Sequence, residues 1–240
     1  MSVCKRHALP AVAVVLGITG FMLRFGLYTV GVDLKNLLVR GHPLEIALWL
    51  CTAAAVSVSL LDSLAMPKIE EYDRCFRISL LSALGHILAA SGIMLTVLQQ
   101  VLQMSPLQPL WKICGVGSAV LLCWAAFSRT MGKRPFFGAY ALTSVFFALH
   151  LVGHYQSWCA DPQLQNYVFA FLATLLMMVF SYLHASFCVD MGKSQLQRMV
   201  GLLAMYCCFV AMPNTQNPEL YLGCGLFAVT SLCAPKLGEK

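Results

Sequence analysis

Eight long apolar stretches, separated by short segments that carry most of the charges, constrain this chain more than any other feature of its sequence. An α-helix needs about 20 apolar residues to cross a hydrocarbon core of about 30 Å. The sequence therefore predicts an all-α, polytopic transmembrane helical bundle of about eight helices, or seven if the last two do not both cross. Residues 1–240 form a single transmembrane domain in this interpretation. The predicted spans are Ala8–Val32, Leu44–Met66, Phe76–Leu98, Leu110–Met131, Phe136–Trp158, Leu164–Val189, Leu196–Met212 and Leu220–Ala234.

The composition argues against a soluble protein and against a nucleic-acid-binding protein. Hydrophobic residues make up 59% of the chain and charged residues 11%, whereas soluble domains carry about 25% charged residues. The formal net charge of +6 would suit nucleic acid only if the basic residues formed one soluble face. Here they lie between apolar runs, so the expected partner is the lipid bilayer.

Lysine and arginine are distributed unequally between alternate sides of the eight predicted spans. Positive residues are retained on the cytoplasmic side during insertion. Twelve against three therefore predicts a multi-pass protein of the cell (plasma) membrane with both termini in the cytoplasm. The predicted inner side holds Lys5, Arg6, Lys68, Arg74, Arg77, Arg129, Lys133, Arg134, Lys193, Arg198, Lys236 and Lys240, and the outer side holds Lys35, Arg40 and Lys112.

The first apolar run resembles the start of a secretory signal peptide, because Lys5 and Arg6 precede it. A signal peptide has an apolar run of only 7–15 residues before its cleavage site. Here the run continues to Arg24 and then resumes. We therefore expect a retained first helix.

Four ionisable residues inside the spans are the candidate binding residues: His86, His150, His154 and Arg24. Ionisable groups at membrane depth are expensive and often functional. Counted from the predicted helix starts, His86 and His150 lie near mid-membrane at depths that differ by about 6 Å. His154 lies one turn beyond His150, and the long side chain of Arg24 is expected to extend to the outer interface.

Three interpretations of these histidines remain open. Each imidazole could simply hydrogen-bond a neighbouring helix, or the group could bind a substrate or relay protons in a transporter. Alternatively, His86 and His150 could be the axial ligands of a haem b, since histidine is a usual ligand of haem iron. No Cys/His spacing typical of another metal site occurs among the eleven cysteines, and no further cofactor is expected.

Small residues and turns supply two weaker patterns. Gly85, Ala89 and Gly92, like Gly223 and Gly225, predict close helix contacts. Three predicted cytoplasmic turns begin with Met66-Pro67-Lys68, Met131-Gly132-Lys133 and Met191-Gly192-Lys193, at a spacing near 60 residues. This spacing suits a duplicated helical hairpin, but a helix end at the membrane surface favours such a sequence without duplication.

The segment GVDLKNLLVRGHPLEIALWL, from Gly31 to Leu50, with the helix that it opens, resembles uncharacterised multi-spanning integral membrane proteins of Gram-positive bacteria. The resemblance implies a bacterial cell-membrane setting. Those proteins have no established activity, so it implies no functional residue.

These observations predict a small-molecule transporter or the substrate-binding membrane component of one. The chain has no phosphate-binding glycine loop, so transport would require an ion gradient or an ATPase partner subunit. The alternatives are a non-catalytic membrane scaffold or accessory subunit, and a haem-binding redox subunit. No catalytic constellation points to an enzyme.

Overall fold

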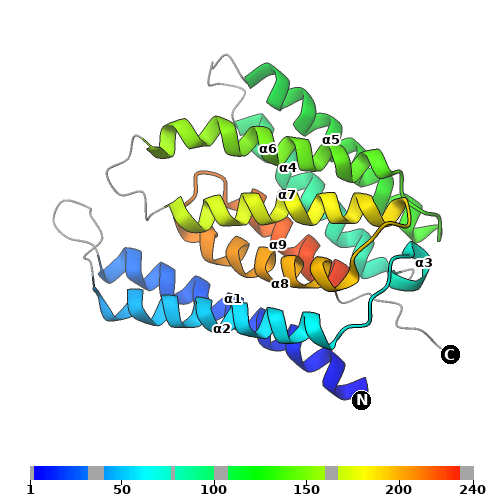
Figure 1. Ribbon diagram of the computed structural model, residues 1–240. Coiled ribbons are helices and arrows are strands. Elements are labelled where there is room, and N and C mark those ends of the chain that lie inside the picture. The colour runs from blue at the N-terminus through cyan, green and yellow to red at the C-terminus, as the bar shows by residue number, and fades with distance from the viewer. Residues whose placement is uncertain (1–2, 32–40, 77–78, 100–107, 160–166, 233–240) are drawn as a thin grey trace.

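The structure, a computed structural model, describes residues 3–31, 41–76, 79–99, 108–159 and 167–232, and eight long helices of these residues form one bundle (Figure 1). The predicted all-α bundle is confirmed, and each predicted span coincides with one long helix. The long helices are α1 (Val3–Val30), α2 (Pro43–Ala65), α4 (Leu80–Gln99), α5 (Gln108–Thr130), α6 (Phe137–Cys159), α7 (Val168–Cys188), α8 (Ser194–Ala211) and α9 (Pro218–Leu232). Two short elements, the single-turn α3 (Tyr72–Cys75) and the 3-10 turn η3 (Met212–Asn214), join them.

The start of α2 shows how local sequence sets a helix boundary. Pro43 occupies the first turn, where its missing N–H costs no hydrogen bond. The His42 side chain accepts from the Leu44 N–H at 3.3 Å, and Glu45 accepts from the Gly41 N–H at 2.9 Å. Both side chains therefore satisfy backbone donors at the helix start.

Within the part of the chain that the structure describes, six helices, α1, α2, α4, α5, α6 and α7, are long and apolar enough to cross a membrane. Their outer faces carry exposed apolar side chains, of which Leu50, Leu64 and Ile113 are 68%, 76% and 70% exposed. A soluble protein would not present such a surface to water. The chain is therefore a multi-pass integral membrane protein.

The two remaining long helices, α8 and α9, lie inside the bundle (Figure 1). α8 contacts α1, α2, α7 and α9, and α9 contacts α4. Neighbouring helices rather than lipid thus surround α8, which explains how it can contain Gln197 and Arg198, both buried. The membrane crossing of α8 and α9 stays a prediction, because α9 has only 15 residues.

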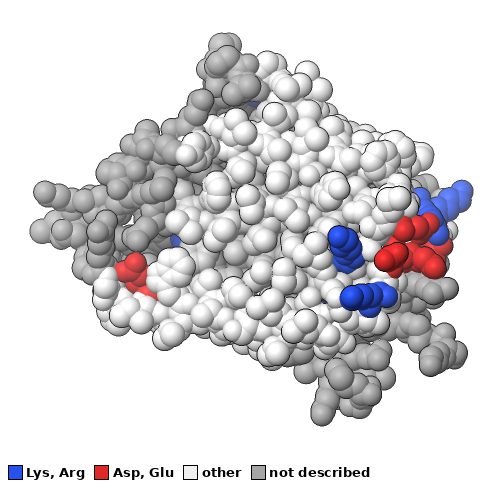
Figure 2. Space-filling view, in the orientation of Figure 1, with Lys and Arg blue, Asp and Glu red and all other residues white. Residues whose placement is uncertain are grey.

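Successive long helices run in opposite directions, so α1 begins and α9 ends at the same end of the bundle (Figure 1). That end, here called the charged end, carries the exposed residues Lys68, Asp73, Arg134, Asp190 and Lys193. Figure 2 shows basic and acidic side chains gathered at this end, next to a broad uncharged surface. By the distribution of Lys and Arg, the charged end is the predicted cytoplasmic end.

Candidate functional site

A buried histidine–tyrosine pair joins α4 to α6 near the charged end. His86 is 0% exposed. Its Nδ1 lies 2.6 Å from the Ser82 carbonyl oxygen, and its Nε2 lies 2.7 Å from the Tyr140 hydroxyl. Because a carbonyl oxygen only accepts, Nδ1 carries the proton in this arrangement. Nε2 is then free to accept from the Tyr140 hydroxyl.

A second imidazole, His184 of α7, lies against the same tyrosine, with ring centroids 5.3 Å apart. Its Nδ1 donates to the Phe180 carbonyl at 3.1 Å, and the Gln197 amide nitrogen lies 3.2 Å from its Nε2. The Phe227 ring of α9 contacts both imidazoles, at 4.7 and 5.4 Å between centroids. Five helices therefore contribute to one buried polar and aromatic cluster.

Arg129, in the last turn of α5, places a guanidinium group beside this cluster. Arg129 is 3% exposed, and its two terminal nitrogens form no well-aligned hydrogen bond among the described residues, although the Tyr140 hydroxyl lies close to the guanidinium. The guanidinium carbon lies 4.8 Å from the Phe76 ring centroid and 6.0 Å from that of Tyr72. These rings belong to α3 and the residue after it, which cover Arg129 from the charged end. Cation–π contacts of this kind partly offset the burial of the charge.

The groups around Arg129 supply no negative charge. Burial raises the pKa of the Tyr72 hydroxyl to about 12 and the pKa of the Cys75 thiol to about 11, outweighing the opposing effect of nearby arginines. Both groups therefore stay protonated at neutral pH. No ion pair connects Arg129 to a carboxylate within the described residues.

A second buried arginine at this end of the bundle is fully paired. Arg198 of α8 forms an ion pair with Asp62 of α2, and their side chains are only 6% and 5% exposed. An ion pair removed from solvent in this way holds its two helices in a fixed register. Arg198 thus contrasts with Arg129, which is equally buried but unpaired.

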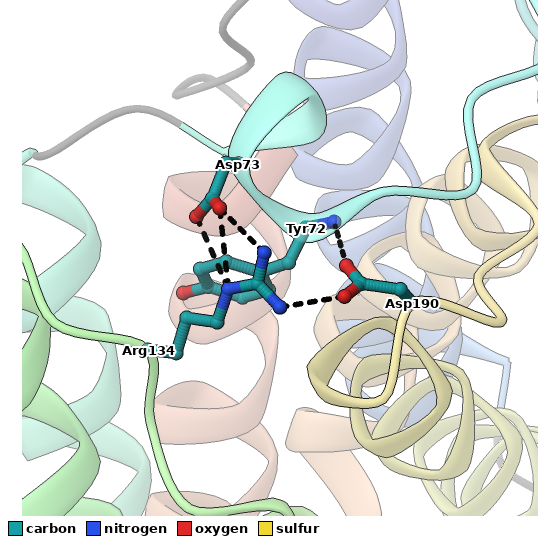
Figure 3. A network of polar contacts seen from close by, with 4 residues as sticks. All are labelled: Tyr72, Asp73, Arg134 and Asp190. Atoms are coloured by element: carbon teal, nitrogen blue, oxygen red, sulfur yellow. Dashed lines mark hydrogen bonds and ion pairs between the residues drawn. The ribbon is translucent and has the colours of Figure 1, made fainter.

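Arg134 organises the surface of the charged end (Figure 3). It lies between Asp73 and Asp190, with contacts of 2.5 Å to the first carboxylate and 2.6 Å to the second. The other oxygen of Asp190 accepts from the Tyr72 N–H at 3.0 Å. One arginine before α6 therefore ties α3 to the turn after α7. All three charged side chains are at least 39% exposed, so each ion pair is individually weak.

The predicted pairing of His86 with His150 is not seen. His86 bonds to Tyr140, and Tyr140 precedes His150 by ten residues on α6, which is about 15 Å along the helix axis. Since α4 begins at Leu80 rather than at Phe76, His86 lies closer to the charged end than the predicted span placed it. The two imidazoles are therefore not arranged to ligate one haem iron from opposite sides.

His150 and His154 lie together toward the other end of α6, with ring centroids 4.3 Å apart. His150 is 2% exposed and stacks on Trp111 of α5, at 5.6 Å between centroids. Its Nδ1 has no hydrogen-bond partner among the described residues. Aromatic rings therefore pack around His150.

Arg24 does not extend to an exposed position as expected. Its side chain is 3% exposed, donates to the Tyr28 hydroxyl at 3.2 Å, and lies 4.8 Å from the ring centroid of Phe169. Phe169 is in the first turn of α7, so the guanidinium is directed toward the predicted outer end. The Phe169 ring of α7 lies against it there.

Sequence reasoning missed Arg129 as a site residue. Arg129 was assigned only to the positive charges of the predicted cytoplasmic side, although it lies within the predicted span Leu110–Met131. The rule that singled out Arg24, an ionisable group inside an apolar run, applies equally to Arg129. No sequence signal indicated Tyr140, because a hydroxyl in an apolar run has no distinctive spacing.

The described residues contain no group of three or more His, Cys, Asp or Glu side chains that could hold a metal ion. The chain matches no known protein family, no curated protein and no solved structure. A functional assignment therefore depends on the chemistry of the site itself.

Proposed function

We propose that this chain is a cell-membrane protein that binds a small molecule through the buried cluster around Arg129, as a transporter or as the substrate-binding component of one. The observation that carries the proposal is Arg129 itself, a buried guanidinium that has no carboxylate partner among the described residues. Burying an unpaired charge is destabilising. A residue that carries this cost without an internal partner is a candidate for ligand binding.

The surrounding cluster gives the site further polar groups. His86, Tyr140 and His184 can each donate or accept a hydrogen bond, depending on the proton position. Because they lie on different helices, small movements between helices would change their contacts. Coupling to an ion gradient, or to an ATPase partner subunit, would supply the energy for transport.

A membrane scaffold or accessory subunit is the second candidate, and the packing of the interior favours it. Ile93, Tyr140, Phe146, Phe180 and Phe227 are all at most 1% exposed. Such close packing favours one fixed arrangement of the helices, as suits a scaffold. Reproducible co-purification with one membrane complex, without any ligand effect, would support the scaffold over the transporter.

Purified protein in neutral detergent, screened against a library of charged and neutral metabolites, tests the proposed function. We expect at least one compound to raise the unfolding temperature, because a ligand that binds only the folded state stabilises it. The same compound should enter liposomes that contain the protein, alone or with its partner subunit. Absence of both stabilisation and uptake across the library would contradict the proposal.

A further inference from the structure

The chemistry of Arg129 defines the kind of ligand that its site can accept. The guanidinium presents two terminal nitrogens that need acceptors, Nη1 and Nη2. Parallel N–H groups of this kind match the two oxygens of a carboxylate or phosphate. Phe76 and Tyr72 contact the guanidinium as ring systems, so they can flank a bound anion without supplying a competing negative charge.

The cover over Arg129 is a single helical turn that packs against the end of α7. α3 is a single turn, and its residues Tyr72 and Cys75, with the following Phe76, pack against Phe187. At the surface it is held by the exposed Arg134 network, through Asp73 and the Tyr72 N–H. The segment before it is held by hydrogen bonds of Ile69 with Ser194 and of Glu70 with Gly192. Two hollows of about 310 and 360 Å³ open nearby at the charged end, and Arg129 lines neither. Arg129 is 3% exposed, with the Tyr72 and Phe76 rings against its guanidinium, so a ligand that approaches from this side would reach it when α3 moves.

We propose that Arg129 binds the oxyanion of a ligand, a carboxylate or a phosphate, in a site that α3 covers and that the Arg134 ion pairs, weak singly but acting together, help to keep closed. This inference rests on the proposed function and names its ligand class. The oxyanion can belong to a soluble metabolite or to a lipid headgroup. The shared requirement is a delocalised negative charge that accepts two hydrogen bonds.

Thermal unfolding of the purified full chain in neutral detergent tests the binding step. The probes are sodium benzoate and inorganic phosphate, each compared with sodium chloride at the same ionic strength. We expect benzoate or phosphate to raise the unfolding temperature by several degrees beyond chloride. Arg129→Gln should weaken the binding at least about tenfold, because it removes a charge-assisted hydrogen-bond donor pair.

Lys133→Gln is the matched control, because it removes one exposed positive charge at the same end of the bundle. It should respond to the oxyanions as the wild type does. Arg129→Lys keeps the charge but loses the paired donors, so it provides a folded variant if Arg129→Gln does not fold. Equal stabilisation of wild type and both Arg129 variants, or no oxyanion effect beyond chloride, would overturn the inference.

Nanodiscs distinguish the two ligand sources. Both lipids carry a phosphate, but only phosphatidylglycerol has a net negative headgroup, so stabilisation by phosphatidylglycerol over phosphatidylcholine, lost in Arg129→Lys, would identify an anionic lipid headgroup. Stabilisation by soluble oxyanions in phosphatidylcholine alone would identify a metabolite. The binding test does not depend on transport. Oxyanion binding without uptake would support the Arg129 site and contradict a transporter. Uptake that Arg129→Lys leaves unchanged would support a transporter and contradict the Arg129 site.

The reactivity of the Cys75 thiol tests the cover. Cys75 is 9% exposed, and maleimide labelling followed by peptide mapping measures its access without any substitution at Arg129. We expect Arg134→Gln to label Cys75 at least about tenfold faster than the wild type, and benzoate or phosphate to slow the labelling in both. Labelling that depends on neither change would contradict a movable α3.

Discussion

The buried histidines His86 and His184 each form one hydrogen bond within their own helix. His86 and His184 both direct Nδ1 to the carbonyl four residues earlier in the same helix. Each then has one ring nitrogen left to connect with another helix. This arrangement satisfies imidazoles in an apolar interior, and it makes Tyr140 the only described hydroxyl that bonds to His86.

Tyr140→Phe tests this hydrogen bond, because it removes only the hydroxyl group. The substitution leaves Nε2 of His86 buried without its donor, which costs about 1–3 kcal/mol in stability. Tyr182→Phe, at a side chain that is 64% exposed, should change stability by much less. Chemical denaturation of both variants in detergent measures the difference. Equal effects of the two substitutions would mean that the His86–Tyr140 contact does not stabilise the fold.

Asp190 gives a prediction about pH. The Tyr72 N–H, and after it Arg134, hold the pKa of the Asp190 carboxyl below its ordinary value of 3.8. A carboxyl with a lowered folded-state pKa stabilises the protein fully above its unfolded-state pKa, and loses that effect as pH falls through the folded-state pKa. Asp190→Asn should therefore be less stable than the wild type at pH 5–7, and the gap should close below about pH 4.

Asparagine suits this comparison because Asp190 has a φ of +55°, a left-handed conformation that asparagine also tolerates. Unfolding temperatures of both proteins between pH 3 and pH 7 provide the measurement. A stability gap that stays constant across this range would show that the carboxylate charge is not responsible.

Among the helices, α4 and α9 approach each other closely because glycines lie at their contact. A Cβ added at Gly223 would lie 2.4 Å from the Leu88 carbonyl oxygen, and one at Gly92 would lie 2.7 Å from that of Glu219. Both obstacles are backbone atoms, which cannot rotate away. The small residues singled out in the sequence therefore mark a true helix contact, in agreement with their expected role.

Gly223→Ala should destabilise the protein by about 1–3 kcal/mol, the usual cost of overpacking. Gly153→Ala is the matched control, because a Cβ at this helical glycine would meet no atom within 4 Å. It should be neutral or slightly stabilising, since glycine inside a helix costs about 0.5–1 kcal/mol relative to alanine. Denaturation in detergent compares the two, and a neutral Gly223→Ala would contradict the close α4–α9 contact.

The similar turns after α5 and α7 are not equivalent in structure. Gly132 has the left-handed backbone, with φ of +71°, in the first turn, whereas Asp190, two residues before Gly192, has it in the second. Gly192 is instead required for space, because a Cβ there would lie 2.2 Å from the Phe187 ring. The tripeptides therefore place the same residues in different roles. This favours ordinary helix-end chemistry as the explanation of the likeness.

For the whole molecule, hydropathy predicted where the helices lie but not which side chains meet. Each apolar run became a helix, because the bilayer demands length and apolar composition from each crossing segment. The partners of Arg129, His86 and Arg24 depend on how helices rotate about their axes, which an apolar run does not encode. The later start of α4 accounts for only about 6 Å of the separation between His86 and His150, and the rest comes from the position of α4 along α6, which the sequence does not encode.

The central claim is that all eight long helices cross the membrane with the charged end in the cytoplasm. The turn between α8 and α9 tests it most directly, because Gln216 is exposed there and lies at the opposite end from Lys193. An epitope inserted after Gln216, with a matched insertion after Lys193, can be probed with antibody in intact and permeabilised spheroplasts. We predict that the Gln216 epitope is detected in intact spheroplasts and the Lys193 epitope only after permeabilisation. Detection of both epitopes only after permeabilisation would contradict the crossing of α8 and α9.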